Sequence, residues 1–166
     1  MIFSGKVHLF DNNIDTDRIY PGQYLDLVKK EEVALHALEG ADPDFVRNCK
    51  KGDFVIAGTN FGCGSSREYA PMSIQACGVS AIIAESFARI FFRNAMNIGL
   101  PVIVCNGIRK NTGKDDVLEL DLEKCEVRNI TNNSILKCEK ISDFALDLIK
   151  EGKDIKEVVL KRKHNI

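Results

Sequence analysis

The residues best suited to chemistry lie in one short stretch, positions 58–70, which reads GTNFGCGSSREYA. Its three glycines allow the backbone to turn sharply and to approach a ligand closely. Ser65, Ser66 and Arg67 then supply two hydroxyl groups and a guanidinium where a helix is expected to begin. A helix start suits anions because its N–H groups are unpaired. This combination predicts a site for a carboxylate substrate that contains an activated serine.

The same residues have a second interpretation that involves no catalysis. Ser65, followed by Glu68 three positions later, matches a capping box, in which side chains satisfy the free N–H groups at a helix start. The two interpretations are compatible, because a serine can cap a helix in the resting state and also face a ligand. A cap alone does not need the glycines upstream, so their density favours the functional interpretation.

The pattern of apolar residues predicts the elements that position this loop. A strand at 53–57 precedes the loop, and a helix at 66–77 follows it. A strand at 80–85, a helix at 87–98 and a strand at 101–105 continue the alternation. This order predicts parallel strands that are joined by right-handed crossovers.

The remaining segments predict one α/β domain over residues 1–166, with parallel central strands and antiparallel additions. A strand at 5–10 and an Asn/Asp-rich loop at 11–21 come first, and a helix at 30–39 follows. Beyond position 106 we expect three short strands and then two amphipathic helical segments. These lie at 117–122, 126–130, 135–139, 143–151 and 155–161.

Length and composition are those of an ordinary soluble globular protein. The 166 residues are 45% hydrophobic and 28% charged, with a formal net charge of −1. Lys and Arg are spread along the chain, so we expect no nucleic-acid binding, which requires a basic face or stripe. We expect neither a membrane span nor a signal peptide, because long apolar runs and a basic leader are missing. A cytoplasmic location is the simplest expectation.

The six cysteines are not spaced as metal ligands. None forms a C-x-x-C pair, so we expect no zinc or iron–sulfur ligand set within this chain. Cys63 lies inside the glycine loop, but a catalytic cysteine requires a histidine base, and no histidine can be placed beside it from the sequence. Four others lie in apolar runs and are expected to behave as small buried hydrophobic residues. They are Cys77, Cys105, Cys125 and Cys138.

The order strand, glycine loop, helix and strand also matches the outline of a dinucleotide-binding unit. Glu85 lies about 20 residues beyond the loop, where that unit carries an acidic residue. Two features count against nucleotide binding. Arg67 stands where the fingerprint needs a third small residue, and no Gly-Lys-Ser/Thr follows the loop as a P-loop requires.

The segment FGCGSSREYAP at 61–71 resembles the serine loop of the swivelling domain in the aconitase superfamily. Three further stretches agree with that domain in the same order, so the resemblance covers roughly residues 6–105. It implies the fold of the C-terminal domain of aconitase, here as the free-standing small subunit of a two-subunit enzyme. The three stretches are NIDTDRIYPGQYL, DPDFV and AESFARIFFRNAMNIGLPVI.

The resemblance implies a hydro-lyase that is active only with a larger partner chain. In the family, the large subunit binds a 4Fe-4S cluster that acts as a Lewis acid on the substrate. We therefore expect the cluster on the partner, no cofactor on this chain and a small dicarboxylate as substrate. The first expectation is a branched 2-hydroxy dicarboxylate, with isomerisation of 2-isopropylmalate and 3-isopropylmalate in leucine biosynthesis.

Matched by position, the family assigns Ser65 as the general base that takes a proton from the carbon next to a substrate carboxylate. Its alkoxide must be stabilised by backbone N–H donors and a nearby cation. Ser66 would donate a hydrogen bond, and Arg67 would hold a substrate carboxylate in a bidentate contact. Thr16 and Asp17 match a Thr-Asp pair in the family's early loop, with Asp17 orienting Arg67. A simple loop brace explains that pair as well.

Substrate selection is expected from Tyr24, Leu25, Asp26 and Leu27, together with Gly64 of the serine loop. In homoaconitase-like subunits an Arg follows the Tyr-Leu pair, whereas in isopropylmalate-type subunits that position tends to be apolar. Asp26 fits neither pattern, and its carboxylate would repel a third substrate carboxylate. The two leucines could contact a branched alkyl group. Small subunits of 2,3-dimethylmalate dehydratase and homoaconitase stay open as alternatives.

An anion-binding module without catalysis is the alternative from a different class. It would need no partner chain and would tolerate the loss of the Ser65 hydroxyl. Tyr69 stands where aconitases usually carry His and is not expected to be catalytic. Arg89 and Arg93, on the helix expected at 87–98, are expected to be structural or interface residues.

Overall fold

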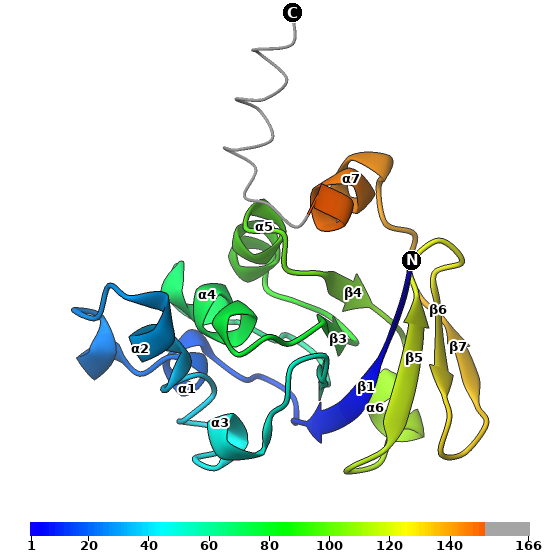
Figure 1. Ribbon diagram of the computed structural model, residues 1–166, viewed down its shortest axis with the longest axis horizontal. Coiled ribbons are helices and arrows are strands. Elements are labelled where there is room, and N and C mark those ends of the chain that lie inside the picture. The colour runs from blue at the N-terminus through cyan, green and yellow to red at the C-terminus, as the bar shows by residue number, and fades with distance from the viewer. Residues whose placement is uncertain (152–166) are drawn as a thin grey trace, which may run out of the picture.

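The fold is built on a seven-stranded sheet in the order β4-β3-β2-β1-β5-β6-β7 (Figure 1). The computed structural model describes residues 1–151, so the helix expected at 155–161 lies outside the described residues. β1 to β4 are parallel, whereas β1–β5, β5–β6 and β6–β7 are antiparallel. The predicted α/β fold with parallel and antiparallel parts is therefore confirmed. The strands are β1 Ile2–Leu9, β2 Phe54–Ala57, β3 Ala81–Ala84, β4 Val102–Val104, β5 Val117–Asp121, β6 Glu126–Asn129 and β7 Ile135–Lys137.

The helices gather around the parallel half of the sheet. α4 connects β2 to β3 and α5 connects β3 to β4, as the alternation of strands and helices predicts. α7 lies beside α5 in Figure 1. No helix within residues 1–151 is long and apolar enough to cross a membrane. The helices are α1 Thr16–Ile19, the 3-10 helix η1 Gly22–Tyr24, α2 Lys30–Ala34, α3 Phe45–Asn48, α4 Tyr69–Ala76, α5 Arg89–Asn97, α6 Ile108–Asn111 and α7 Asp143–Glu151.

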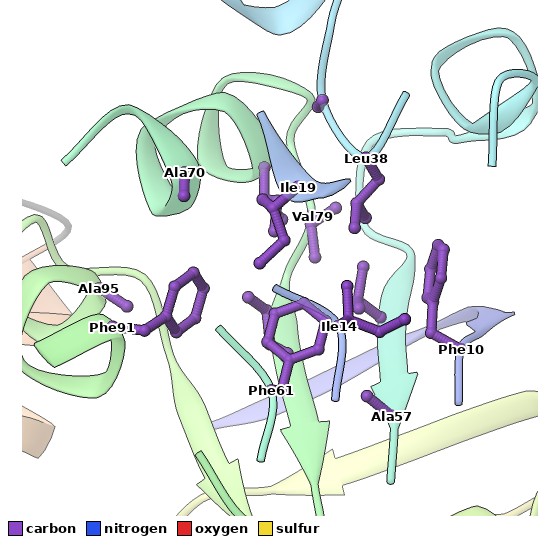
Figure 2. Packing of buried hydrophobic residues seen from close by; sticks show 14 of the residues in the cluster. Phe10, Ile14, Ile19, Leu38, Ala57, Phe61, Ala70, Val79, Phe91 and Ala95 are labelled. Carbon is purple, nitrogen blue, oxygen red and sulfur yellow. The ribbon is translucent and has the colours of Figure 1, made fainter. Parts of the chain in front are cut away.

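The two inner strands of the parallel half, β2 and β3, are buried on both faces, which explains their continuous apolar sequences FVIA and AIIA. Alternate residues of β2 point to opposite faces of the sheet and enter two different hydrophobic clusters. Val55 and Ala57 belong to the first cluster, and Phe54 and Ile56 belong to the second. The first cluster also contains side chains from α1, α4 and α5, and Figure 2 shows part of it. These helices are therefore fixed to the sheet face beside the carboxyl end of β2, where the serine loop begins.

Three predicted elements differ from the structure. The helix expected at 66–77 begins only at Tyr69, and its N-terminal cap, Glu68, makes no side-chain capping bond. The capping box of Ser65 and Glu68 was therefore a wrong prediction. The helix expected at 30–39 ends at Ala34, because the chain turns so that the Leu38 N–H bonds to the carbonyl of Ile19 at 2.7 Å.

The loop expected at 11–21 contains the short helix α1. A single helical turn of this kind has few internal hydrogen bonds and needs local support. Asp15 supplies it, because its side chain accepts a hydrogen bond from the Arg18 N–H at 2.8 Å. This turn matters for the site because it fixes Thr16 and Asp17 at its start.

Candidate active site

The early loop at 13–16 and the serine loop at 59–63 lie side by side, although more than forty residues separate them in the sequence. Backbone hydrogen bonds of 2.8 Å tie them together at three points. The serine loop can follow the early loop because Gly62 and Gly64 adopt positive φ angles of 78° and 98°, which favour glycine. The three bonds run from Asn13 to Thr59, from Gly62 to Ile14 and from Thr16 to Cys63.

Ser65 and Thr16 are joined through their side chains. The Oγ atom of Ser65 lies 3.2 Å from Oγ1 of Thr16, within hydrogen-bond distance. Thr16 is 3% exposed, whereas Ser65 is exposed. A Cβ atom on Gly64 would lie 3.3 Å from the same Thr16 oxygen, so glycine keeps space open around this contact. The structure therefore presents the Ser65 hydroxyl to solvent with a buried hydroxyl behind it.

Arg67 is held beside the two hydroxyl groups. One terminal nitrogen lies 2.5 Å from the carboxylate of Asp17, and the other donates to the carbonyl of Tyr20 at 3.2 Å. A Cβ atom on Gly22 would lie 3.3 Å from the guanidinium, so η1 passes directly beside it. A guanidinium carries five N–H donors, so these two contacts leave donors available for a substrate carboxylate. The structure thus brings together Asp17 and Arg67 as the sequence predicts.

The backbone around Ser65 offers further donors. Within residues 1–151, the N–H groups of Ser65, Ser66 and Arg67 donate to no acceptor, and none of the three lies in a regular element. Adjacent free N–H groups form a concave site that favours negative charge. The side chain of Ser66 is exposed and has no hydrogen-bond partner among the same residues. The segment that carries the Ser65 hydroxyl therefore also carries unpaired backbone donors.

The predicted substrate-selecting residues are only partly brought to this site. The Tyr24 ring stacks on His36 with centroids 3.5 Å apart, and its hydroxyl donates to Glu39 at 3.1 Å. The Tyr24 side chain is therefore held by residues outside the candidate site. Leu25 is 38% exposed and Asp26 is exposed. Leu27 packs against the core. Tyr24 ends η1 and the other three residues follow it, so the segment continues from Gly22, which lies beside the Arg67 guanidinium.

Tyr20 is a residue of the candidate site that the sequence reasoning missed. It is fully buried, its carbonyl accepts the Arg67 bond, and its ring stacks on Tyr69 at 5.6 Å. Burial and the neighbouring Tyr69 and Tyr24 raise the pKa of Tyr20, so its hydroxyl stays protonated and donates to the Tyr24 carbonyl at 2.8 Å. The available signal was a large aromatic residue inside a polar segment, which indicates an anchored loop. Tyr69 supports this anchor.

The cysteines of the described part do not form a cluster site. An iron–sulfur cluster needs several cysteine thiolates close together. Within residues 1–151, the potential metal ligands that lie within 4.8 Å of one another are His8, Cys49 and Asp53, a group with a single cysteine. Cys105 is fully buried as expected, whereas Cys77 is only partly buried. Cys125 and Cys138 are also only partly buried, so full burial was a wrong expectation for all three. Cys77 and Cys138 nevertheless pack against the hydrophobic clusters, as small apolar residues do.

The chain belongs to the aconitase C-terminal domain family, whose model matches residues 4–106. It is 48% identical to the isopropylmalate/citramalate isomerase small subunit of Methanocaldococcus jannaschii, over 91% of this chain and 90% of that protein. It is 49% identical to a 3-isopropylmalate dehydratase small subunit of Caldicellulosiruptor saccharolyticus, over 92% of this chain and 88% of that protein.

Two further matches are another small subunit and a solved structure. The methanogen homoaconitase small subunit of Methanothermobacter thermautotrophicus is 46% identical over 91% of this chain and 87% of that protein. The crystal structure of 3-isopropylmalate dehydratase from Methanocaldococcus jannaschii superposes with a TM-score of 0.89 at 39% identity. It covers 98% of this chain and 99% of that chain. The fold of the aconitase C-terminal domain is therefore shown by sequence and by structure.

Proposed function

We propose that the chain is the small subunit of a two-subunit hydro-lyase that isomerises 2-isopropylmalate and 3-isopropylmalate, as in leucine biosynthesis. Relatives at 48% and 49% identity carry names of this kind. The observation that carries the proposal is the 3.2 Å contact between Ser65 and the buried Thr16, with Arg67 held alongside by Asp17. The chain would act as one swivelling domain over residues 1–166.

In this proposal Ser65 takes the proton from the substrate carbon that lies next to a carboxylate. A serine hydroxyl is a very weak acid, so its alkoxide requires strong stabilisation. Thr16 can donate a hydrogen bond to the Ser65 oxygen, because either hydroxyl of the pair can act as donor. The free N–H groups of residues 65–67 serve in this proposal as further donors for the charged oxygen.

Arg67 binds one carboxylate of the substrate and so fixes the carbon that loses its proton. Asp17 and the Tyr20 carbonyl hold the guanidinium in place, which reduces the entropy lost when substrate binds. Ser66 donates a hydrogen bond to the bound substrate in this proposal. The exposed position of the site requires another surface to exclude water when the reaction takes place.

That surface belongs, in our proposal, to a large subunit that carries a 4Fe-4S cluster. The cysteines described above do not fit such a cluster, so we assign no step to one on this chain. On the partner, the cluster supplies Lewis acidity toward the hydroxyl group that leaves the substrate. We also propose a cytoplasmic location, which suits six cysteines that are all free.

The substrate is proposed to be a branched malate without a third carboxylate. Asp26 and Leu25 are exposed shortly after Gly22, which lies beside Arg67. In this proposal the charge of Asp26 repels an additional carboxylate, and Leu25 offers an apolar contact. Overall similarity does not decide this point, because relatives named for isopropylmalate, citramalate and homoaconitase are 46–48% identical to this chain. A substrate panel of isopropylmalate, citramalate, 2,3-dimethylmalate and homocitrate is therefore needed.

The test is anaerobic reconstitution of this chain with its cluster-loaded large subunit, followed by hydration and dehydration assays. We expect Ser65→Ala to lower kcat by about 10²–10⁴, the scale for removing a general base. Ser4→Ala, at an exposed serine of β1, is the matched control and should keep wild-type activity. A preference for homocitrate would overturn the role given to Asp26. No turnover by an intact complex would favour an anion-binding module.

A further inference from the structure

A second positively charged surface borders the serine loop on the side of α5. A hollow of about 420 Å³ is lined by residues of the serine loop and of the start of α5. Ser65 follows directly after one of its lining residues, so the hollow and the catalytic loop are continuous. We call this surface the arginine face. Its residues are Gly62, Gly64, Ala88, Arg89, Ile90 and Arg93.

The arginine face is rigidly connected to the serine loop. The Phe61 N–H bonds to the Ser86 carbonyl at 3.1 Å, and the Ala88 N–H bonds to the Phe61 carbonyl at 2.9 Å. The rings of Phe61 and Phe91 pack edge to face with centroids 5.2 Å apart, as Figure 2 shows. A Cβ atom on Gly62 would come within 2.2 Å of Phe91, so the loop and α5 are in direct contact. Whatever docks on one surface is therefore held in a fixed position relative to the other.

The charges of the arginine face are not neutralised within the described part of the chain. Arg89 and Arg93 are exposed, and neither forms an ion pair with a carboxylate of residues 1–151. They lie four positions apart on one helix, where like charges repel each other. Ile90 lies between them in the sequence and is 51% exposed. The described part of the chain thus exposes one apolar side chain and two guanidinium groups along the same hollow beside its candidate site.

We propose that the arginine face is the docking surface for the cluster-bearing large subunit, which meets it with carboxylate side chains around an apolar contact for Ile90. This inference rests on the proposed function. Ser65 must face the partner's cluster, so the surface continuous with Ser65 lies at the same interface. The exposed isoleucine favours a protein partner, because a substrate carboxylate would need only the two guanidinium groups. Complementary charge at such a rim mainly speeds association and sets orientation.

The test measures binding of the large subunit by titration, with a fluorescent label on this chain, at low and high salt. We expect Arg89→Glu combined with Arg93→Glu to weaken binding at least tenfold and to reduce its salt dependence. Arg128→Glu, an exposed arginine of β6 at the antiparallel end of the sheet, is the matched control and should bind as wild type. Circular dichroism and thermal unfolding verify that each variant is folded.

The outcomes separate this inference from the proposed function. If the double variant binds the large subunit normally, the inference is overturned, and a raised KM for substrate would then assign the arginines to substrate binding. If the wild-type chain binds no large subunit at all, the proposed function is contradicted, and the docking inference that rests on it is overturned as well. If binding weakens equally in Arg128→Glu, the effect reflects net charge, and the arginine face is not a specific docking surface.

Discussion

At the scale of single residues, the proposed mechanism depends most directly on the contact between Thr16 and Ser65. We expect Thr16→Val to lower kcat about 10- to 100-fold with a smaller change in KM, because a hydrogen bond to a charged oxygen is lost at a buried position. Steady-state kinetics of the reconstituted complex measure this. Thr16→Ser keeps the hydroxyl and should retain most activity. Equal loss in both variants would show that Thr16 acts only through packing.

The site could be predicted from the sequence to the extent that its groups lie in recognisable stretches. Ser65, Arg67, Thr16 and Asp17 were identified by matching the family's two loops, and the structure brings all four together. Tyr20 could not be predicted in the same way, because it acts through a backbone carbonyl that every residue has. Tertiary position alone gives that carbonyl its role.

At the scale of elements, the close contact of Gly62 with α5 leads to a stability prediction. Gly62→Ala would force a methyl group against Phe91 and strain a residue with a φ of 78°. We expect the free energy of unfolding to fall by about 2–4 kcal/mol. Urea unfolding monitored by circular dichroism measures the change.

The matched control for this prediction is Gly113→Ala. Gly113 is exposed, and an added Cβ would be in ordinary contact with Asp116 at 3.4 Å. A change within about 0.5 kcal/mol is expected there. Similar losses in the two variants would mean that the serine loop does not depend on the contact with α5.

Elements with strong periodicity were predicted well, and short elements were not. The buried strands β2 to β4 and the helix α5 agree with their predictions within a few residues, because their hydrophobic patterns are continuous. The start of α4 was misplaced because Ser65 and Glu68 form a local capping pattern, while tertiary contacts of Ser65 and Arg67 hold that segment out of the helix. Local propensity yields to such long-range contacts.

At the scale of the whole molecule, Asp53 connects the early part of the chain to β2. It is 6% exposed, accepts hydrogen bonds from the backbone N–H groups of Lys6 and Lys50, and contacts His8 at 2.8 Å. Burial alone would raise the pKa of Asp53, but these partners outweigh it and hold the pKa below its usual value. Its ionised form therefore stabilises the fold.

The sign of the resulting pH dependence follows from this depressed pKa. The stabilisation that ionised Asp53 gives to the fold is fully present above the pKa of about 3.9 that the group has in the unfolded chain. It is lost as pH falls through the lower pKa of the folded state. We expect Asp53→Asn to lose about 1–3 kcal/mol at pH 7 and to show a weaker fall in stability below about pH 4. Urea unfolding at pH 7 and pH 3 tests this. Asp115→Asn, at an exposed position, should behave as wild type.

The hydrogen bond between Ile19 and Leu38 has a consequence for which positions of the chain can vary in length. It closes residues 20–37 into a loop whose two ends are already adjacent, so a longer chain at its exposed positions costs little extra closure entropy. Its buried positions Val33 and Ala37 stay tied to the core. Residues 23–37 include Tyr24 to Leu27 but exclude Tyr20 and Gly22, which contact Arg67. If the proposed function holds, we expect the exposed positions of this segment to be a place where loop length can change substrate range while the contacts of Ser65, Thr16 and Arg67 stay unchanged.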